Sequence, residues 1–127
     1  MGKIVFCEDD PMIKKLIQAA MRGETHEVHI ASDGAEGLEV IRRIRPDVVF
    51  SDVSMPTMDG YQLGDALQAD AATAGIPIVF MTASVQRAQI DEAMHHGAAA
   101  VLPKPFTMAE LRARVTEFTS GGPRDGR

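Results

Sequence analysis

Residues 47–52 read Asp-Val-Val-Phe-Ser-Asp, a short apolar run that ends in a carboxylate. A run of this length and composition indicates a strand that is covered on both faces. Similar aliphatic runs recur along the chain, and the full set of five is residues 3–7, 27–31, 47–51, 76–82 and 99–103. The segments between the runs carry apolar residues at helical spacing. The sequence therefore predicts five strand–helix units in an α/β fold, with a parallel sheet and helices on both of its faces.

Local signals support this order of elements. Asp10 stands before Pro11, a pattern typical of a helix cap followed by a first-turn proline. Thr107 with Glu110 fits a capping box at the start of the last helix. The run at 27–31 alternates polar and apolar residues, so we expect it at an edge of the sheet.

The overall composition and net charge limit the classes of function that the chain can have. The chain has 127 residues, of which 45% are hydrophobic and 24% charged, as in an ordinary globular domain. We expect one domain over residues 1–119, and a flexible tail or the start of a linker over residues 120–127, which are rich in Gly and Pro. The formal net charge of −5 argues against direct binding to nucleic acid or to an anionic membrane.

The single cysteine, Cys7, cannot form an internal disulfide, and its position in an apolar run predicts a buried thiol in a reducing compartment. No apolar stretch is long enough to span a membrane, and the N-terminus has no signal-peptide pattern. We therefore expect a cytoplasmic protein.

Polar side chains follow four of the predicted strands. They are Glu8, Asp9 and Asp10 after the first run, Asp52 after the third, Thr82 at the end of the fourth and Lys104 after the fifth. Ligands of open parallel sheets bind beyond the carboxyl ends of the strands. We therefore expect these side chains to converge on one edge, although Asp10 itself is better explained as a helix cap.

Such a group of acids has a definite chemistry. Two like charges about 4 Å apart repel by roughly 4 kcal/mol at an effective dielectric near 20, so the cluster requires a cation. Carboxylate oxygens suit Mg²⁺ better than Zn²⁺ or copper. A carboxylate beside Mg²⁺ and the ammonium of Lys104 is arranged for attack on phosphorus, which makes Asp52 a candidate phosphoacceptor. The hydroxyl of Thr82 would then donate a hydrogen bond to a phosphoryl oxygen only in the modified state.

The chain resembles the receiver domains of two-component response regulators over residues 3–119. Four segments carry the resemblance, and they are Ile4-Val5-Phe6-Cys7-Glu8-Asp9-Asp10-Pro11, residues 47–56 with Met58-Asp59-Gly60, Met81-Thr82-Ala83, and Pro103-Lys104-Pro105-Phe106. Each is weak alone, but four in this order and spacing are specific. The resemblance implies a flavodoxin-like sheet of strand order 2-1-3-4-5.

The resemblance also implies roles for individual residues. Asp52 falls at the phosphoacceptor, and the implied metal ligands are Glu8, Asp9, Asp52 and the backbone carbonyl of Ser54. Thr82, the backbone of Ala83 and Lys104 fall at phosphate-contacting positions. The Lys104–Pro105 peptide bond is expected to be cis, and Mn²⁺ is expected to substitute for Mg²⁺.

The implied function is a phosphoacceptor switch, not an enzyme with a turnover substrate. A sensor histidine kinase or phosphotransfer protein would donate the phosphoryl group, and a downstream protein or effector domain would read the altered surface. One position departs from the family pattern, because Val101 stands where receivers usually have Tyr or Phe. Valine has no ring to reorient, so coupling from Thr82 to the face of the fourth helix, fifth strand and fifth helix is left open.

Three other functions are compatible with parts of the pattern. A receiver-like module that binds proteins without phosphorylation fits Val101. An aspartyl-nucleophile phosphatase of the haloacid-dehalogenase kind would have Asp where Ser54 stands, and would need a cap domain. A flavodoxin-like cofactor carrier would need a Gly- and Ser/Thr-rich phosphate loop, whereas this chain has acids after its first strand.

Overall fold

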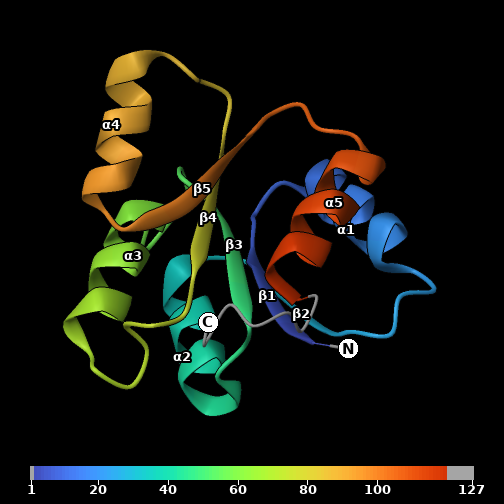
Figure 1. Ribbon diagram of the computed structural model, residues 1–127, viewed down its shortest axis with the longest axis horizontal. Helices are drawn as coiled ribbons and strands as arrows, with labels where there is room; N and C mark the ends of the chain where they lie inside the picture. Colours follow the sequence, from blue (N-terminus) through green and yellow to red (C-terminus); the bar gives the residue numbers. More distant parts are fainter. Residues whose placement is uncertain (1, 120–127) are drawn as a thin grey trace.

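The computed structural model describes residues 2–119, in which five strands alternate with five helices (Figure 1). The strands are β1 (Lys3–Cys7), β2 (Glu27–Ala31), β3 (Val48–Asp52), β4 (Ile78–Thr82) and β5 (Ala98–Pro103). The helices are α1 (Pro11–Met21), α2 (Gly34–Ile44), α3 (Gly60–Ala69), α4 (Arg87–His95) and α5 (Met108–Thr119). The tail expected over residues 120–127 lies outside the described residues.

The strands form one sheet of order β2-β1-β3-β4-β5, and every neighbouring pair is parallel. The predicted fold class and the edge position of β2 are both confirmed. The predicted start of β4 at residue 76 was wrong by two residues, because the strand begins at Ile78, directly after Pro77. Proline has no backbone N–H to donate to a neighbouring strand, and it therefore favours strand ends.

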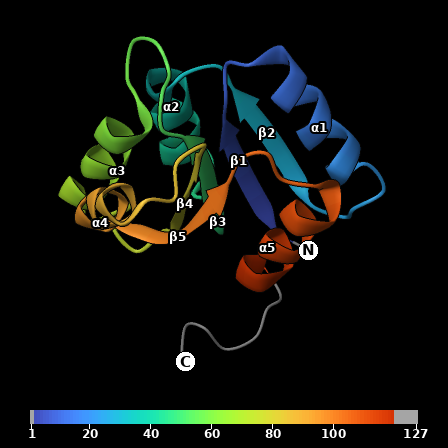
Figure 2. The ribbon, with the colours of Figure 1, turned by 90° about the horizontal axis from the view of Figure 1, so that it is seen from above.

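Alternate strand residues divide the core into two layers. One layer lies between the sheet and the pair α1 and α5, where the rings of Phe6 and Phe50 stack with centroids 5.2 Å apart. The other lies between the sheet and α2, α3 and α4, and it contains Phe80 and Leu63. Figure 2 shows the two groups of helices on opposite sides of the sheet. This arrangement leaves the carboxyl ends of the central strands free of a covering helix.

Capping contacts fix the ends of the helices. The carboxylate of Asp10 accepts a hydrogen bond from the N–H of Met12 at 2.8 Å, as predicted for the start of α1. At the start of α5, Thr107 and Glu110 form the predicted capping box. Met108 in the first turn of α5 is 39% exposed, whereas Leu111 and Val115 in its later turns are buried.

Cys7 is buried and is a free thiol, as the sequence predicted. Burial raises the pKa of Cys7 to about 12, and the nearby carboxylates of Asp33 and Glu36 act in the same direction. The thiolate is the reactive form of cysteine, so this residue is chemically quiet at neutral pH. Within residues 2–119, no helix combines the length and hydropathy needed to traverse a bilayer.

The first residue of α3 brings two segments into close contact. The N–H of Gly60 donates to the carbonyl oxygen of Val53 at 2.9 Å, and a Cβ at this position would collide with the carbonyl oxygen of Asp52. Glycine is thus required to seat α3 against the end of β3.

We expect Gly60→Ala to lower the free energy of unfolding by about 1–3 kcal/mol, because the added methyl overpacks the end of β3. The matched control is Gly75→Ala, since a Cβ there meets nothing within 4 Å. Urea unfolding measures both variants. A Gly60→Ala protein as stable as the control would contradict this account of α3.

Candidate functional site

The strand register brings the predicted acids together at the carboxyl edge of the sheet. In the ladders Cys7 pairs with Ser51 and Asp52 pairs with Met81, so the residues that follow β1 and end β3 are neighbours. Glu8, Asp9 and Asp52 can each offer one carboxylate oxygen, and these oxygens all lie within 4.8 Å of one another. Two adjacent strands thus supply three negative charges to one point.

Lys104 supplies the positive charge that faces this cluster. Its Nζ lies 3.0 Å from Oε1 of Glu8 and 3.0 Å from Oδ1 of Asp52. The backbone helps to place the residue, because its N–H donates to the carbonyl oxygen of Thr82 at 2.8 Å. The Lys104–Pro105 peptide bond is cis. Burial by itself would lower the pKa of Lys104, but the contacts with the two carboxylates outweigh it and the pKa is raised.

Glu8 is the most deeply placed of the acids, with a fully buried side chain. Its Oε2 accepts a hydrogen bond from the N–H of Asp10 at 3.1 Å, whereas its buried Oε1 has no hydrogen-bond partner among the described residues. Lys104 approaches this Oε1 as an ion pair. Burial raises the pKa of Glu8, and although the hydrogen bond from Asp10 and the ammonium of Lys104 oppose this rise, the charge of Asp52 adds to it.

These observations fit a hard divalent cation. A buried carboxylate oxygen without a hydrogen bond is available as a ligand, and the oxygens of Asp9 and Asp52 are close enough to share an ion with it. All the side-chain donors are oxygens, which is the ligand set that Mg²⁺ and Mn²⁺ prefer. Lys104 offsets one negative charge of three, so the cluster keeps an unbalanced charge that a cation would neutralise.

Thr82, Ala83 and Ser54 follow or end the strands β4 and β3, whereas Val101 does not. Thr82 ends β4, and Ala83 follows it as an exposed residue at the same edge. Ser54 lies two residues beyond Asp52 in the loop before α3, and its side chain is exposed. Val101 lies inside β5, half-buried against the layer under α2, α3 and α4, and so apart from the acids.

Sequence reasoning missed one contact of Thr82. Its Oγ1 accepts a hydrogen bond from the N–H of Ser84 at 3.2 Å, which ties the hydroxyl to the loop before α4. The signal was present, because Thr side chains commonly bond the backbone two residues further on. The contacts of Lys104 with both Glu8 and Asp52 also depend on tertiary distances that spacing alone does not give.

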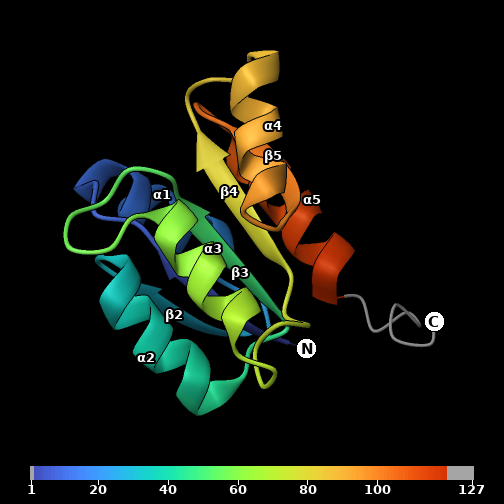
Figure 3. The same cartoon turned by 90° about the vertical axis from the view of Figure 1, so that its left-hand side faces the viewer.

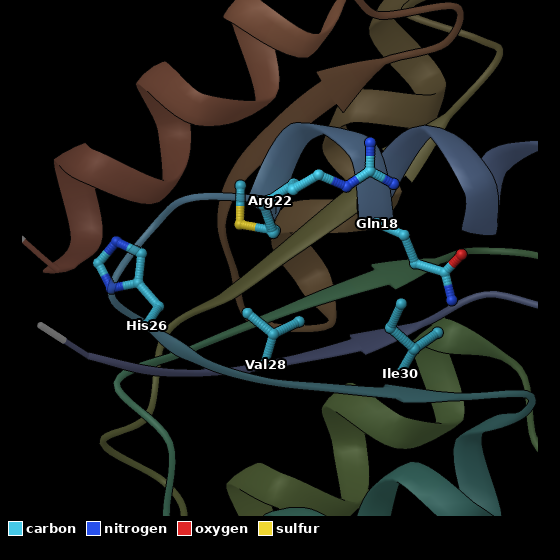
Figure 4. Close-up of a pocket in the computed structure, with 6 residues that line it drawn as sticks. Gln18, Arg22, His26, Val28 and Ile30 are labelled. Atoms are coloured by element: carbon cyan, nitrogen blue, oxygen red, sulfur yellow. The ribbon is translucent and has the colours of Figure 1, made fainter.

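A separate hollow of about 650 Å³ lies between α1 and β2 (Figure 4). Its lining residues are Gln18, Met21, Arg22, His26, Val28 and Ile30. None of them belongs to the acid cluster, and Figure 4 shows the guanidinium of Arg22 and the ring of His26 well apart. The hollow therefore has no convergent polar groups, and the candidate site is the acidic edge.

Fold and site together define the class as a doubly wound α/β domain with an acidic, lysine-bearing site at the carboxyl ends of its strands. The sequence model of a protein family, the response regulator receiver domain, matches residues 4–116. The chain belongs to this family, the receiver domains of two-component signalling systems.

Individual relatives agree with this assignment. The DNA-binding response regulator MtrA of Mycolicibacterium smegmatis is 34% identical over 113 residues, which are 89% of this chain and 48% of the relative. The chain thus spans about half the length of the curated relatives that it matches.

Solved structures agree as well. The chemotaxis response regulator CheY4 of Vibrio cholerae has a TM-score of 0.86 at 28% identity, covering 93% of this chain and 98% of that one. The receiver domain of sensor histidine kinase PA1611 of Pseudomonas aeruginosa, solved with a magnesium ion in its active site cleft, has a TM-score of 0.83 at 26% identity, covering 92% and 96%.

We expect Asp9→Asn to raise the free energy of unfolding in EDTA by about 0.5 kcal/mol, because it removes like-charge repulsion at a solvent-exposed position. Added Mg²⁺ should stabilise the wild type, since a ligand that binds only the folded state shifts the equilibrium toward it, and should stabilise the variant less.

Urea unfolding with and without Mg²⁺ measures both effects. Asp10→Asn is the control, because asparagine also caps a helix and Asp10 lies outside the cluster. An equal response of Asp9→Asn and wild type to Mg²⁺ would remove Asp9 from the metal site.

Proposed function

We propose that this protein is a phosphorylation-dependent switch in which Asp52 receives a phosphoryl group in a reaction that needs a divalent cation. The observation that carries the proposal is the meeting of three acids with Lys104 at the carboxyl edge, with the ammonium 3.0 Å from Asp52. Membership of the receiver family supports the same role. The domain would extend over residues 1–119.

The chain's own groups account for the chemistry. A carboxylate oxygen of Asp52 would attack phosphorus, the bond between phosphorus and the donor's leaving atom would break, and the leaving group would depart with its electron pair. Lys104 would contact a phosphoryl oxygen and balance its charge. Glu8, Asp9, Asp52 and the carbonyl of Ser54 would hold Mg²⁺, or Mn²⁺ in its place. The ion would neutralise charge on the phosphoryl oxygens.

The switch would begin at Thr82. Its hydroxyl and the backbone of Ala83 would bind the new phosphoryl oxygens, and Thr82 would then cease to accept the N–H of Ser84. That change would release the loop that leads into α4. A contact that exists in only one state is what biases a two-state equilibrium.

The partners follow from this chemistry. The donor would be a sensor histidine kinase or a phosphotransfer protein, and the reader a downstream protein or an effector domain. MtrA is named a DNA-binding regulator, but this segment carries a net charge of −5, and we assign it no nucleic-acid contact and no membrane contact of its own. The proposed location is the cytoplasm. A module that binds proteins without phosphorylation is the alternative, favoured by the valine at position 101.

Asp52→Asn should reduce phosphoryl labelling by acetyl phosphate and Mg²⁺ about tenfold or more, because the amide is a poor nucleophile. Intact-protein mass spectrometry measures the labelling. Asp59→Asn is the matched control, since Asp59 caps α3 and asparagine caps equally well. Equal labelling of wild type and Asp52→Asn would refute the proposed function, and an unlabelled wild type would favour the alternative.

Thr82→Val should keep labelling within about threefold of wild type, because Thr82 does not attack phosphorus. It should abolish the phosphorylation-dependent change in the amide chemical shift of Ser84, since valine cannot accept that hydrogen bond. NMR spectra before and after addition of acetyl phosphate test this, with Ser84→Ala as a backbone-preserving control. A Ser84 response that persists in Thr82→Val would disprove the route through the hydroxyl.

A further inference from the structure

Helix α4 is weakly held by the core. Ala93 is its one fully buried residue, and Gln86 at its N-terminus makes no side-chain capping hydrogen bond. In Figures 1 and 3 the C-terminal end of α4 lies next to α3, whereas its N-terminal end extends beyond it. The helix therefore depends on contacts at its C-terminal end.

His96 makes those contacts. Its Nδ1 lies 2.7 Å from a carboxylate oxygen of Asp65 on α3, and its Nε2 lies 2.9 Å from one of Glu92 on α4. The ring also stacks on Tyr61 of α3, with centroids 4.5 Å apart and planes 12° from parallel. One imidazole thus joins two helices through both nitrogens and one face.

This geometry suits the protonated ring alone. A neutral imidazole carries one N–H, so one of its nitrogens would present a lone pair to a carboxylate. The imidazolium donates from both nitrogens, and its charge also favours the face of an aromatic ring. We propose that protonated His96 fastens the C-terminal end of α4 to α3, and that loss of this proton loosens α4.

The two carboxylates around the ring both raise the pKa of His96. Asp65 contributes most to raising the pKa of His96, Glu92 adds to it, and partial burial opposes them. Tyr61 covers the ring face and in turn meets the edge of Phe80 from β4. On the β5 side, Gly97 and Ala98 carry no charge. The pKa of His96 is higher in the folded protein than in the unfolded chain, where it is near 6.5. The stabilisation is therefore complete below about pH 6.5 and is lost as the pH rises through the folded-state pKa.

The contacts of His96 also bear on the proposed phosphorylation switch. Thr82 acts on the loop that enters the N-terminal end of α4, whereas His96 holds the opposite end. Protonation would thus set how far α4 can respond to phosphorylation. This consequence rests on the proposed function, whereas the fastening contact does not.

Two measurements on the unphosphorylated protein, without Mg²⁺, test the fastening. An NMR titration of the histidine rings should place the midpoint of His96 above that of His95, its exposed neighbour. Asp65→Asn and Glu92→Gln should each lower the His96 midpoint, because each removes a carboxylate that contacts the ring. Both substitutions lie on the surface, so the variants are expected to fold.

Native-state hydrogen exchange then measures the local stability of α4. Between about pH 5.5 and about pH 8.5, protection factors of the α4 amides should fall roughly three- to tenfold more than those of α1, as expected for surface ion pairs. His96→Gln should abolish this difference, and His95→Gln should keep it.

Equal midpoints for the two histidines, or an α4 protection that follows α1 in the wild type, would overturn the proposal. Asp52→Asn protein should behave as the wild type in both measurements. A failure of Asp52 to accept phosphate therefore leaves this test intact, and a failure here leaves the phosphoacceptor role intact.

Discussion

The repulsion among carboxylates at one edge of the sheet is the constraint on which the rest of this structure depends. Strand order places β1 beside β3, so Glu8 and Asp9, which directly follow β1, meet Asp52 at the end of β3. Lys104 balances part of that charge through contacts of 3.0 Å with Glu8 and Asp52. The fold thus keeps an unbalanced negative charge at a fixed point, which favours the binding of a cation there.

The sequence determined the fold well because its signals are local. Apolar runs, a capping aspartate before Pro11 and the alternation within β2 each describe a few neighbouring residues, and each was sufficient to predict the element it marks. The error in β4 falls at its end, because Pro77 stood inside the predicted strand and the strand begins at Ile78.

The features of the site also divide into those that the sequence could predict and those that it could not. The acids could be predicted to meet because parallel strands present their carboxyl ends at one edge, which is a property of topology and not of distance. The bond between Thr82 and the N–H of Ser84 is local and could have been predicted. The contact of His96 with Asp65 could not, because Asp65 is 31 residues away and the approach depends on how α3 and α4 pack.

Val101 bears on how a signal could leave the site. With a valine at that position, the aromatic groups on this side of the sheet are those of Phe80 and Tyr61, which meet edge to face, with His96 stacked on Tyr61. His96 joins the C-terminal end of α4 to α3, and the rings of Tyr61 and Phe80 connect this point to β4. In the proposed switch, a change at Asp52 would reach α4 from its other end, through Thr82 and the loop of Ser84. A helix that is held at its C-terminal end and acted on at its N-terminal end can pivot while Ala93, its buried residue near the held end, stays in place.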